Sequence, residues 1–451
     1  MPTPLTSQHM PAEQPGQHFD YKPGELPEPY ANQSVRNAPL VVPRENRTPI
    51  VPEGFAVNVY AEGLSHPRRL LVLPNGDVLI AEQKTGYLTM TRDDNGDGKA
   101  DWIERHASGF NLPYGLAYRD NDILVTDQDG IWRVPYHVGE LRPPYAEEEP
   151  IDKVPPEKRK PEPTTDGQSM ITPQGVFGLV QGHKNRDLAV DPKTGDLFVG
   201  VGSTGNIGVE PEVKGTIQRF APDGSHQETY ASGMRNPTAI AFQPETGDLW
   251  AVVQERDGLG DGLVPDYLAR VRQGAFYGWP YAYIGPHPQP GFAEFAPDKV
   301  ESTVTPELLF ESHSSLLGLA FYDGTMFPEE YRGDLFVAAH GSWNREKPTG
   351  YKIMRVKFEN GSPEGGYDNF ATGFWVDGPE RAHVWGRPAD VAVAKDGALL
   401  VADDTSGIIW RIAYAGDGKG RVAKTESTEN MKMSARGDAP ASKPPRRKPA
   451  A

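Results

Sequence analysis

The stretch His183-Lys184-Asn185-Arg186-Asp187-Leu188-Ala189-Val190, continued by Gly195-Asp196-Leu197-Phe198-Val199, is one copy of a pattern that recurs six times in this 451-residue chain. Each copy has a polar or proline-containing approach, an apolar strand, a tight turn and a second apolar strand. The first strands begin at Leu70, Leu116, Leu188, Ile240, Leu319 and Val391. The turns and second strands read NGDVLIAE, NDILVTD, TGDLFVGV, TGDLWAVV, RGDLFVAA and DGALLVAD. This repeat is typical of propeller blades, so we expect an all-β, six-bladed β-propeller of four-stranded antiparallel blades.

Three segments lie outside the repeats. Residues 1–50 are rich in Pro, Gln, Asn and Glu, which predicts an extended or disordered N-terminal arm whose removal up to residue 45 is nearly harmless. The strand FAVNVY at 55–60 precedes the first repeat, and we expect it to complete the last blade, because ring closure removes exposed sheet edges. The propeller then covers 51–414, with a Pro/Glu/Lys-rich insertion at 139–178 and a disordered tail at 415–451.

Composition excludes several function classes. The formal net charge of -16 and pI of about 5.2 argue against a nucleic-acid partner and suit a protein that handles small molecules. Without cysteine there is no disulfide, thiolate metal site or thiol nucleophile. No apolar run reaches the roughly 18 residues of a membrane span. The N-terminus shows no signal segment, so the chain is expected to be cytoplasmic or to lack its leader.

Strand reversal assigns the loops to two faces. In a four-stranded meander, the loops leading into the first strands share a face with the loops between second and third strands. The lead-in loops carry Arg68, Arg69, Asn111, Tyr114, His183, Arg186, Arg235, Asn236, His313 and Arg387. The loops between second and third strands are 82–84, 127–129, 203–206, 255–258, 340–345 and 403–404. The sequence therefore predicts a funnel rich in Arg, His and Asn on an acidic protein.

Within this funnel His183 is the candidate general base, because a neutral imidazole can accept a proton near neutral pH. The alternative is a packing or hydrogen-bonding role, although His183 shares its repeat offset with Arg235. Arg235, Arg387 and Arg345 are candidates for binding a polycarboxylate, since guanidinium groups pair bidentately with carboxylates. Their alternative role is ion pairing between loops.

Residues 93–104 (DDNGDGKADWIE) match the calcium-loop pattern D-x-N-x-D-G-x5-E. The candidate ligands are Asp93, Asn95, Asp97, Asp101 and Glu104. The alternative is an Asp/Asn/Gly hairpin without an ion. By strand count this loop joins a third and a fourth strand on the face away from the funnel, so a bound calcium would be structural.

Six phrases carry a family resemblance: GFAVNVYAEGL, YASGMRNPTAIAF, ERDGLGDGLVPDYL, GAFYGWPY, LFVAAHGSWNR and VWGRPADVAV. They resemble the soluble pyrroloquinoline-quinone-dependent sugar dehydrogenases, in particular the sorbosone-dehydrogenase-like branch, over roughly residues 52–414. The resemblance implies a six-bladed propeller with pyrroloquinoline quinone (PQQ) and Ca²⁺ on the funnel floor. It also implies oxidation of a sugar or related alcohol or aldehyde by hydride transfer to PQQ, an external electron acceptor, and a periplasmic or secreted location.

The resemblance also implies roles for individual residues. The catalytic base matches His183, and the pair that contacts cofactor and substrate matches Arg235 and Asn236. A cofactor-carboxylate arginine matches Arg387, and the loop that donates carbonyls to calcium matches 255–261, through Gly258 and Leu259. The sequence departs from the family at three places. Ala389 stands where a second arginine is expected, and Arg345 lies near the place of an expected lysine. Phe110 stands where a glutamine is expected, with Asn111 next to it.

Two other functions stay open. A six-bladed calcium-dependent lactonase would need a metal cluster on the axis, for which Asn111, Asn206, Glu82 and Asp403 are available. A non-catalytic interaction module is the other, because propellers often serve that purpose.

Overall fold

The computed structural model describes residues 13–141 and 167–416. The predicted tail from 417 onward and most of the predicted insertion lie outside these residues. Helical structure is confined to η1 (Pro23–Glu25), η4 (Ala293–Phe295), α1 (Pro297–Glu301) and η5 (Glu329–Tyr331) within the described ranges. None of these helices is long or apolar enough to cross a membrane. The predicted all-β class is confirmed.

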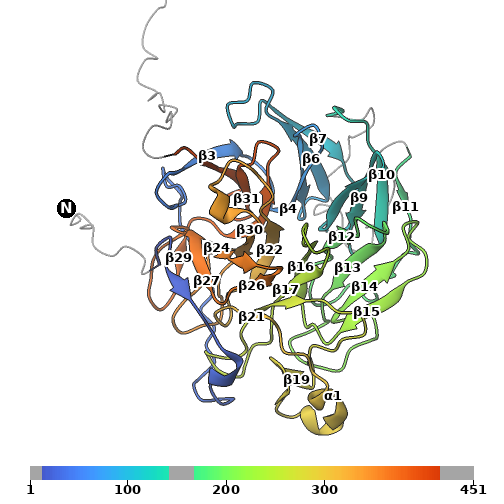
Figure 1. Cartoon of the computed structure of the whole chain (residues 1–451), viewed down its shortest axis with the longest axis vertical. Coiled ribbons are helices and arrows are strands. Elements are labelled where there is room, and N and C mark those ends of the chain that lie inside the picture. Colours follow the sequence, from blue (N-terminus) through green and yellow to red (C-terminus); the bar gives the residue numbers. More distant parts are fainter. Residues whose placement is uncertain (1–12, 142–166, 417–451) are drawn as a thin grey trace, which may run out of the picture.

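Most strands belong to six antiparallel sheets of four or five strands (Figure 1). The first three sheets contain β4 (Pro67–Val72), β5 (Val78–Glu82), β6 (Tyr87–Arg92) and β7 (Trp102–Ala107); β8 (Leu116–Arg119), β9 (Asp122–Thr126), β10 (Ile131–Pro135) and β11 (Ser169–Met170); and β12 (Leu188–Val190), β13 (Leu197–Val201), β14 (Thr216–Phe220) and β15 (Glu228–Ser232).

The other three contain β16 (Pro237–Phe242), β17 (Leu249–Val253), β18 (Tyr267–Arg270) and β21 (Leu308–Leu309); β22 (Leu316–Phe321), β23 (Leu335–Ala339), β24 (Lys352–Val356), β27 (Tyr367–Ala371) and β1 (His18–Phe19); and β30 (Pro388–Val393), β31 (Leu399–Asp403), β32 (Ile408–Tyr414) and β3 (Phe55–Ala61). Small pairings involve β19 (Ala282–Tyr283) with β20 (His287–Pro288), β25 (Phe358–Glu359) with β26 (Ser362–Pro363), and β28 (Trp375–Asp377) with β29 (His383–Val384) and β2 (Leu40–Val41).

The hydrophobic core is divided among the spaces between neighbouring sheets. β5 shows why: its alternate side chains point to opposite faces, so Leu79 and Ala81 pack toward the second sheet while Val78 and Ile80 pack toward the last. The first strands contact one another in the order β4, β8, β12, β16, β22 and β30, and β30 contacts β4 again. Strands buried on both faces therefore read as nearly continuous apolar runs, which is the pattern that the repeats show.

The strand predicted from 55–60 is β3, and it pairs antiparallel with β32 from Phe55↔Tyr414 to Ala61↔Ile409. The described part of the arm before it, residues 13–50, is packed along the sheets. β1 pairs with β27, and β2 pairs in parallel with β29. Lys352, whose side chain is fully buried, forms an ion pair with Glu13 at 2.9 Å. Removing residues 1–45 would take away this partner of a buried ammonium, so we now expect the deletion to lower stability.

The observed element boundaries differ from the expected ones in two respects. Four first strands begin about three residues earlier than the apolar run, because a β-bulge follows Pro67, Pro237, Leu316 and Pro388. Such a bulge leaves one residue unpaired and turns it toward the strand end. The insertion placed at 139–178 also contains β11, which pairs with β10 and supplies the fourth strand of its sheet.

A buried ion-pair cluster lies where the first strands meet. Arg69 donates to Asp390 at 2.7 Å and to the Thr238 carbonyl at 3.1 Å, and its guanidinium lies 2.9 Å from Asp187. It also stacks over the Tyr114 ring at 4.8 Å. These partners come from four different sheets, so a single guanidinium connects five of the six.

Candidate active site

Two adjoining cavities open beside the first strands, on the face predicted for the funnel. The first holds about 200 Å³ and is lined by His183, Arg235, Gln254, Glu255, Asp257, Asp266, His313, Ser315, Trp343 and Asn344. The second holds about 280 Å³ and is lined by Arg68, Gln83, Gly182, His183, Lys184, Asn185, Asn236, Gln254, Ser315, Leu317 and His340. Lead-in loops and loops between second and third strands both contribute to these linings. His183 belongs to both.

His183 is held with one ring nitrogen directed to solvent space. Its Nδ1 lies 3.1 Å from the Ser203 carbonyl and 3.0 Å from Ser203 Oγ. That hydroxyl donates its own hydrogen to the Gly205 carbonyl, so both Ser203 oxygens can only accept, and Nδ1 carries the proton. Nε2 then keeps its lone pair. Burial, followed by the charge of Arg235, lowers the pKa of His183 to about 3, which keeps the imidazole neutral at physiological pH.

A glycine allows His183 to approach Asn236. A Cβ atom at Gly202 would lie 2.3 Å from Asn236 Oδ1 and 2.6 Å from His183 Cβ, distances that no side chain permits. Asn236 donates to Gln254 Oε1 at 3.0 Å, while its buried Oδ1 accepts no hydrogen bond from the described residues. An unsatisfied buried amide oxygen next to a cavity is a candidate for ligand contact.

Arg235 is 5% exposed and its guanidinium is fixed by neutral oxygens. Nε donates to the Asn206 carbonyl at 2.9 Å, Nη1 donates to the Glu255 carbonyl at 2.8 Å, and Nη2 donates to Asn206 Oδ1 at 3.2 Å. Burial lowers its pKa, and the nearby carboxylates of Asp257 and Glu255 oppose that shift. The side chain is thus rigid and charged against the wall of the first cavity.

The remaining cofactor-binding candidates lie farther back. Arg387 donates to the carbonyls of His340 and Gly341 at 2.9 and 3.0 Å, behind the lining residue His340. Arg345 is paired with Glu311 and lies 3.5 Å from Asp261, which is the loop-to-loop ion pairing considered as its alternative. Asn111 donates to Asp129 at 2.9 Å. None of these three lines either cavity among the described residues.

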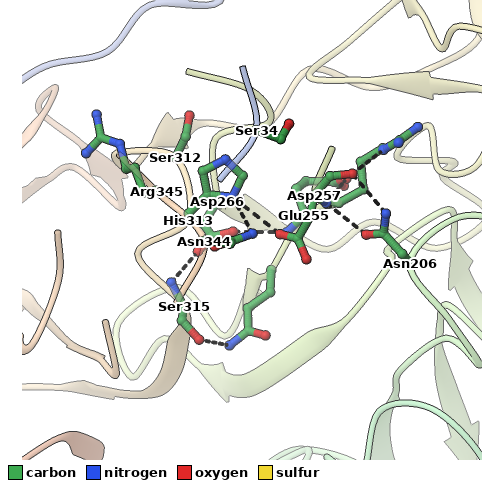
Figure 2. Close-up of polar contacts among 12 residues, drawn as sticks. Ser34, Asn206, Glu255, Asp257, Asp266, Ser312, His313, Ser315, Asn344 and Arg345 are labelled. Atoms are coloured by element: carbon green, nitrogen blue, oxygen red, sulfur yellow. Dashed lines mark hydrogen bonds and ion pairs between the residues drawn. The ribbon is translucent and has the colours of Figure 1, made fainter. Parts of the chain in front are cut away.

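Sequence reasoning missed Asp266, a buried residue just before β18. Its two carboxylate oxygens accept from the backbone N–H groups of Glu255 and Ser315 at 3.0 and 2.7 Å, which joins the loops of two sheets (Figure 2). Burial raises its pKa to about 6. A polar residue inside the apolar stretch LVPDYL is the signal that could have identified it.

Glu255 is the second acidic group of the first cavity. It is 4% exposed, and its Oε1 accepts no hydrogen bond from the part of the chain that the structure describes. Burial raises its pKa to about 7, although Arg235 opposes the shift. On the same loop, Asp257 lies 3.3 Å from His313 Nδ1. Burial would lower the pKa of His313, but this pairing outweighs burial and raises it (Figure 2).

The two carbonyls suggested as calcium ligands differ in their contacts. The Leu259 carbonyl accepts from the Tyr30 N–H of the N-terminal arm at 2.7 Å. Residues 13–141 and 167–416 supply no hydrogen bond to the Gly258 carbonyl. Gly258 has a φ of +93°, a backbone conformation that favours glycine.

The loop at 93–104 lies away from both cavities, between β6 and β7. Its oxygens fold onto its own backbone: Asp93 accepts from Gly96 and Gly98, and Asp101 accepts from the backbone N–H of Asp94 at 2.8 Å. Asn95 and Asp97 each accept from the second residue beyond them at 2.8 and 2.9 Å. Within the described ranges no three His, Asp or Glu side chains are grouped as a metal site. A calcium site here remains a prediction.

The lactonase alternative gains no support from these positions. Glu82 accepts from the Ser65 N–H, Asp403 accepts from the Arg387 N–H at 2.8 Å, and Asn206 is bound to Arg235. Asn111 is hydrogen-bonded to Asp129. Each of the four side chains therefore binds a different partner.

Comparison with known proteins identifies the lineage. The sequence model of the glucose/sorbosone dehydrogenase family matches residues 179–411. The chain belongs to the glucose/sorbosone dehydrogenase family. A TrAA12-like model matches residues 49–262. The family resemblance found in the motifs is thereby confirmed.

Relatives within and around the glucose/sorbosone dehydrogenase family share most of this chain's length. An uncharacterized protein of Borreliella burgdorferi is 28% identical over 374 residues, which cover 81% of this chain and 90% of that protein. The pyrroloquinoline quinone-dependent pyranose dehydrogenase of Coprinopsis cinerea is 23% identical over 354 residues, 68% of this chain but 44% of that protein. The chain therefore spans less than half of that enzyme.

Solved structures show the same fold. The holo form of the PQQ domain of the Coprinopsis cinerea pyranose dehydrogenase has a TM-score of 0.63 and 20% identity, with 82% of this chain and 98% of that chain covered. The likeness at this identity concerns the arrangement of strands and sheets.

Proposed function

We propose that the protein is a quinoprotein dehydrogenase that oxidises a sugar or related alcohol or aldehyde, with His183 as general base. We also propose that its six sheets form a six-bladed propeller closed by β3, and that it works in the periplasm or outside the cell. The observation that carries the proposal is the neutral imidazole of His183, whose Nε2 lone pair is free in a cavity with Arg235 and Asn236.

The second cavity fits a polycarboxylate such as PQQ. Arg68 and Lys184 line it, and no Asp or Glu does so among the described residues. Arg68 is balanced by Asp404 at 2.9 Å, while Lys184 forms no ion pair within the described part of the chain. Burial, and then repulsion from Arg186, lowers the pKa of Lys184, so a bound carboxylate would relieve an unfavourable charge. We assign the cofactor carboxylates to this end, with Asn236 in the same lining and Arg235 in the lining of the adjoining cavity as further partners.

The first cavity fits the cation. Calcium prefers six to eight oxygen ligands. Glu255 Oε1 lines this cavity without a hydrogen bond from the described residues, and the Gly258 carbonyl lies three residues further along the same loop. Bound PQQ and Ca²⁺ would supply an electrophilic two-electron acceptor for hydride. His183 would take the hydroxyl proton on Nε2 as the substrate's C–H hydrogen leaves with its electron pair. Ser203 would hold the ring through Nδ1, and Arg235 would disfavour a resident proton.

Reconstitution tests the proposal. Purified protein is titrated with PQQ and calcium, and a sugar panel is then offered with a redox dye as external electron acceptor. Single-turnover reduction of the bound quinone should slow about 10²–10⁴-fold in His183→Ala, the range for loss of a general base, while quinone binding is retained. Arg235→Ala should instead weaken quinone binding, by about 1.5–3 kcal/mol for a charge-assisted hydrogen bond.

His313→Ala is the matched control, because His313 lines the same cavity but is ion-paired with Asp257. If His183→Ala reduces the quinone at the wild-type rate, another residue is the base. If no variant matters and the wild-type protein binds no quinone, the dehydrogenase proposal fails.

A further inference from the structure

The N-terminal arm crosses two loops that line the first cavity. Between η1 and β2, residues 26–39 contain no helix or strand. Such a segment must place its backbone and side-chain hydrogen bonds elsewhere. In this arm they go to the loop at 257–261 and to the loop at 343–346.

Three contacts join the arm to the first loop. The Tyr30 N–H donates to the Leu259 carbonyl at 2.7 Å. Asn32 Oδ1 accepts from the Asp261 N–H at 2.6 Å, and Ser34 Oγ accepts from the Gly260 N–H at 3.1 Å. The approach is close enough that a Cβ at Gly260 would lie 2.5 Å from Asn32 Oδ1.

Asn37 makes the contacts to the second loop. Its N–H donates to the Trp343 carbonyl at 3.0 Å, and its Oδ1 accepts from the Arg345 N–H at 3.1 Å. Its Nδ2 donates to the carbonyls of Arg345 and Glu380. The two loops also meet directly, because the Glu346 N–H donates to Asp261 at 2.5 Å.

Both ends of this segment are anchored. Upstream, β1 is paired with β27, and downstream β2 is paired with β29. The segment is therefore held across the loops. Those loops supply Asp257, Trp343 and Asn344 to the cavity lining.

We propose that residues 30–37 are positioning residues: they form a strap that fixes the loops at 257–261 and 343–346 and so shapes the first cavity. The effect on cofactor binding rests on the proposed function, since the 257–261 loop carries the Gly258 carbonyl assigned to calcium. The effect on the two loops is independent of the proposed function.

The test uses the full chain with Ser34→Ala combined with Asn37→Ala. Amide hydrogen exchange is measured in peptides that cover 257–263 and 340–347. The variant removes the acceptors of the Gly260 and Arg345 N–H groups, so exchange in both peptides should speed about 5–10-fold. That factor is what loss of one hydrogen bond of about 1 kcal/mol gives. Peptides from β5 and β6 should exchange at the wild-type rate.

Lys22→Ala is the matched control, because Lys22 lies on the same arm and its one ion pair within the described residues is with Asp20, at 2.6 Å. Asn37→Asp is the second variant: it keeps an acceptor for the Arg345 N–H but cannot donate to the Arg345 and Glu380 carbonyls, so it should loosen the 340–347 peptide and leave the 257–263 peptide unchanged. In the reconstitution assay, the calcium concentration for half-maximal quinone binding should rise at least about fivefold in the double variant and stay unchanged in Lys22→Ala.

Unchanged exchange in both loops would overturn the strap. Faster exchange with an unchanged calcium requirement would overturn its role in shaping the site. If the wild-type protein binds no quinone while exchange still rises, the proposed function fails and the strap stands.

Discussion

Replacing Arg69 by Met tests how the sheets are held around the site. Arg69 is 6% exposed, and its partners Asp187 and Asp390 are 3% and 1% exposed. Backbone N–H groups also bind both carboxylates: the Ile240 N–H donates to Asp187 at 2.7 Å, and the Leu70 N–H donates to Asp390 at 2.8 Å. Without the guanidinium, two buried carboxylates keep only backbone donors and lose their counter-charge.

Breaking a buried ion pair by removing one partner costs about 3–5 kcal/mol, because the other charge stays buried. At about 2 °C per kcal/mol for a domain of this size, Tm should fall by roughly 6–10 °C at pH 8. The fall should be smaller at pH 5.5. Burial already raises the pKa of Asp390 to about 7 against the opposing charge of Arg69, so without that charge the carboxyl is protonated more readily.

The assay is differential scanning calorimetry of wild type, Arg69→Met and the triple variant Arg69→Met/Asp187→Asn/Asp390→Asn. The triple variant removes the buried charge, and each amide oxygen can still accept its backbone N–H, so at least half of the loss should be recovered. A single variant that melts within about 2 °C of wild type would refute the reasoning. So would a triple variant no more stable than the single one.

Four further expectations can be checked on the same protein. Because the pKa of His183 is lowered to about 3, quinone reduction should show no acidic limb from this residue between pH 8 and 5, and a limb at pH 6–7 that persists in Glu255→Gln would contradict the assignment. Burial raises the pKa of Glu255 in the folded state, so the contribution of Glu255 to the free energy of unfolding falls as pH rises from about 4.5 to 7. Between pH 5 and 8 the free energy of unfolding of Glu255→Gln should therefore rise relative to that of wild type by about 1–3 kcal/mol. Curves of Tm against pH that run parallel for the two proteins would contradict this. Deleting residues 1–61 removes β3 and should expose the edge of β32 and cause aggregation, whereas unchanged cooperative melting would count against closure. Asp93→Ala with Asp97→Ala should reduce the calcium dependence of Tm and spare quinone binding; selective loss of the quinone would reverse the assignment of faces.

The sequence predicted the repeats well because both strands and turns are local features. Leu116 and Leu188 begin their strands as expected, since the apolar run and the pairing coincide there. At Pro67 and Pro237 a bulge adds residues that lie before the apolar run, and no periodicity reports an unpaired residue.

The arm shows the other limit of sequence reasoning. Its composition is that of a disordered segment, yet Glu13 reaches Lys352 and Asn37 reaches Arg345, both more than 300 positions away. Contacts of this kind depend on the finished fold. The same reason explains why Arg345 and Arg387 seemed equivalent: only the structure shows that one is balanced by Glu311 and the other is bound to carbonyls.

Arg235 shows how a single buried charge can serve both binding and proton transfer. Its N–H groups are satisfied by neutral oxygens, and it forms no ion pair within the described part of the chain, so its charge is not cancelled at close range. That field disfavours a proton on His183, so in the proposed role the imidazole would be free to accept one when substrate arrives. The same field favours an anion in the cavity, whether a cofactor carboxylate or the oxygen that becomes negative as its proton leaves. A guanidinium paired directly with a carboxylate, like that of Arg345, would neither disfavour a proton on a neighbouring imidazole nor favour an anion. The neutral hydrogen-bond partners of Arg235 are therefore what distinguishes it from Arg345.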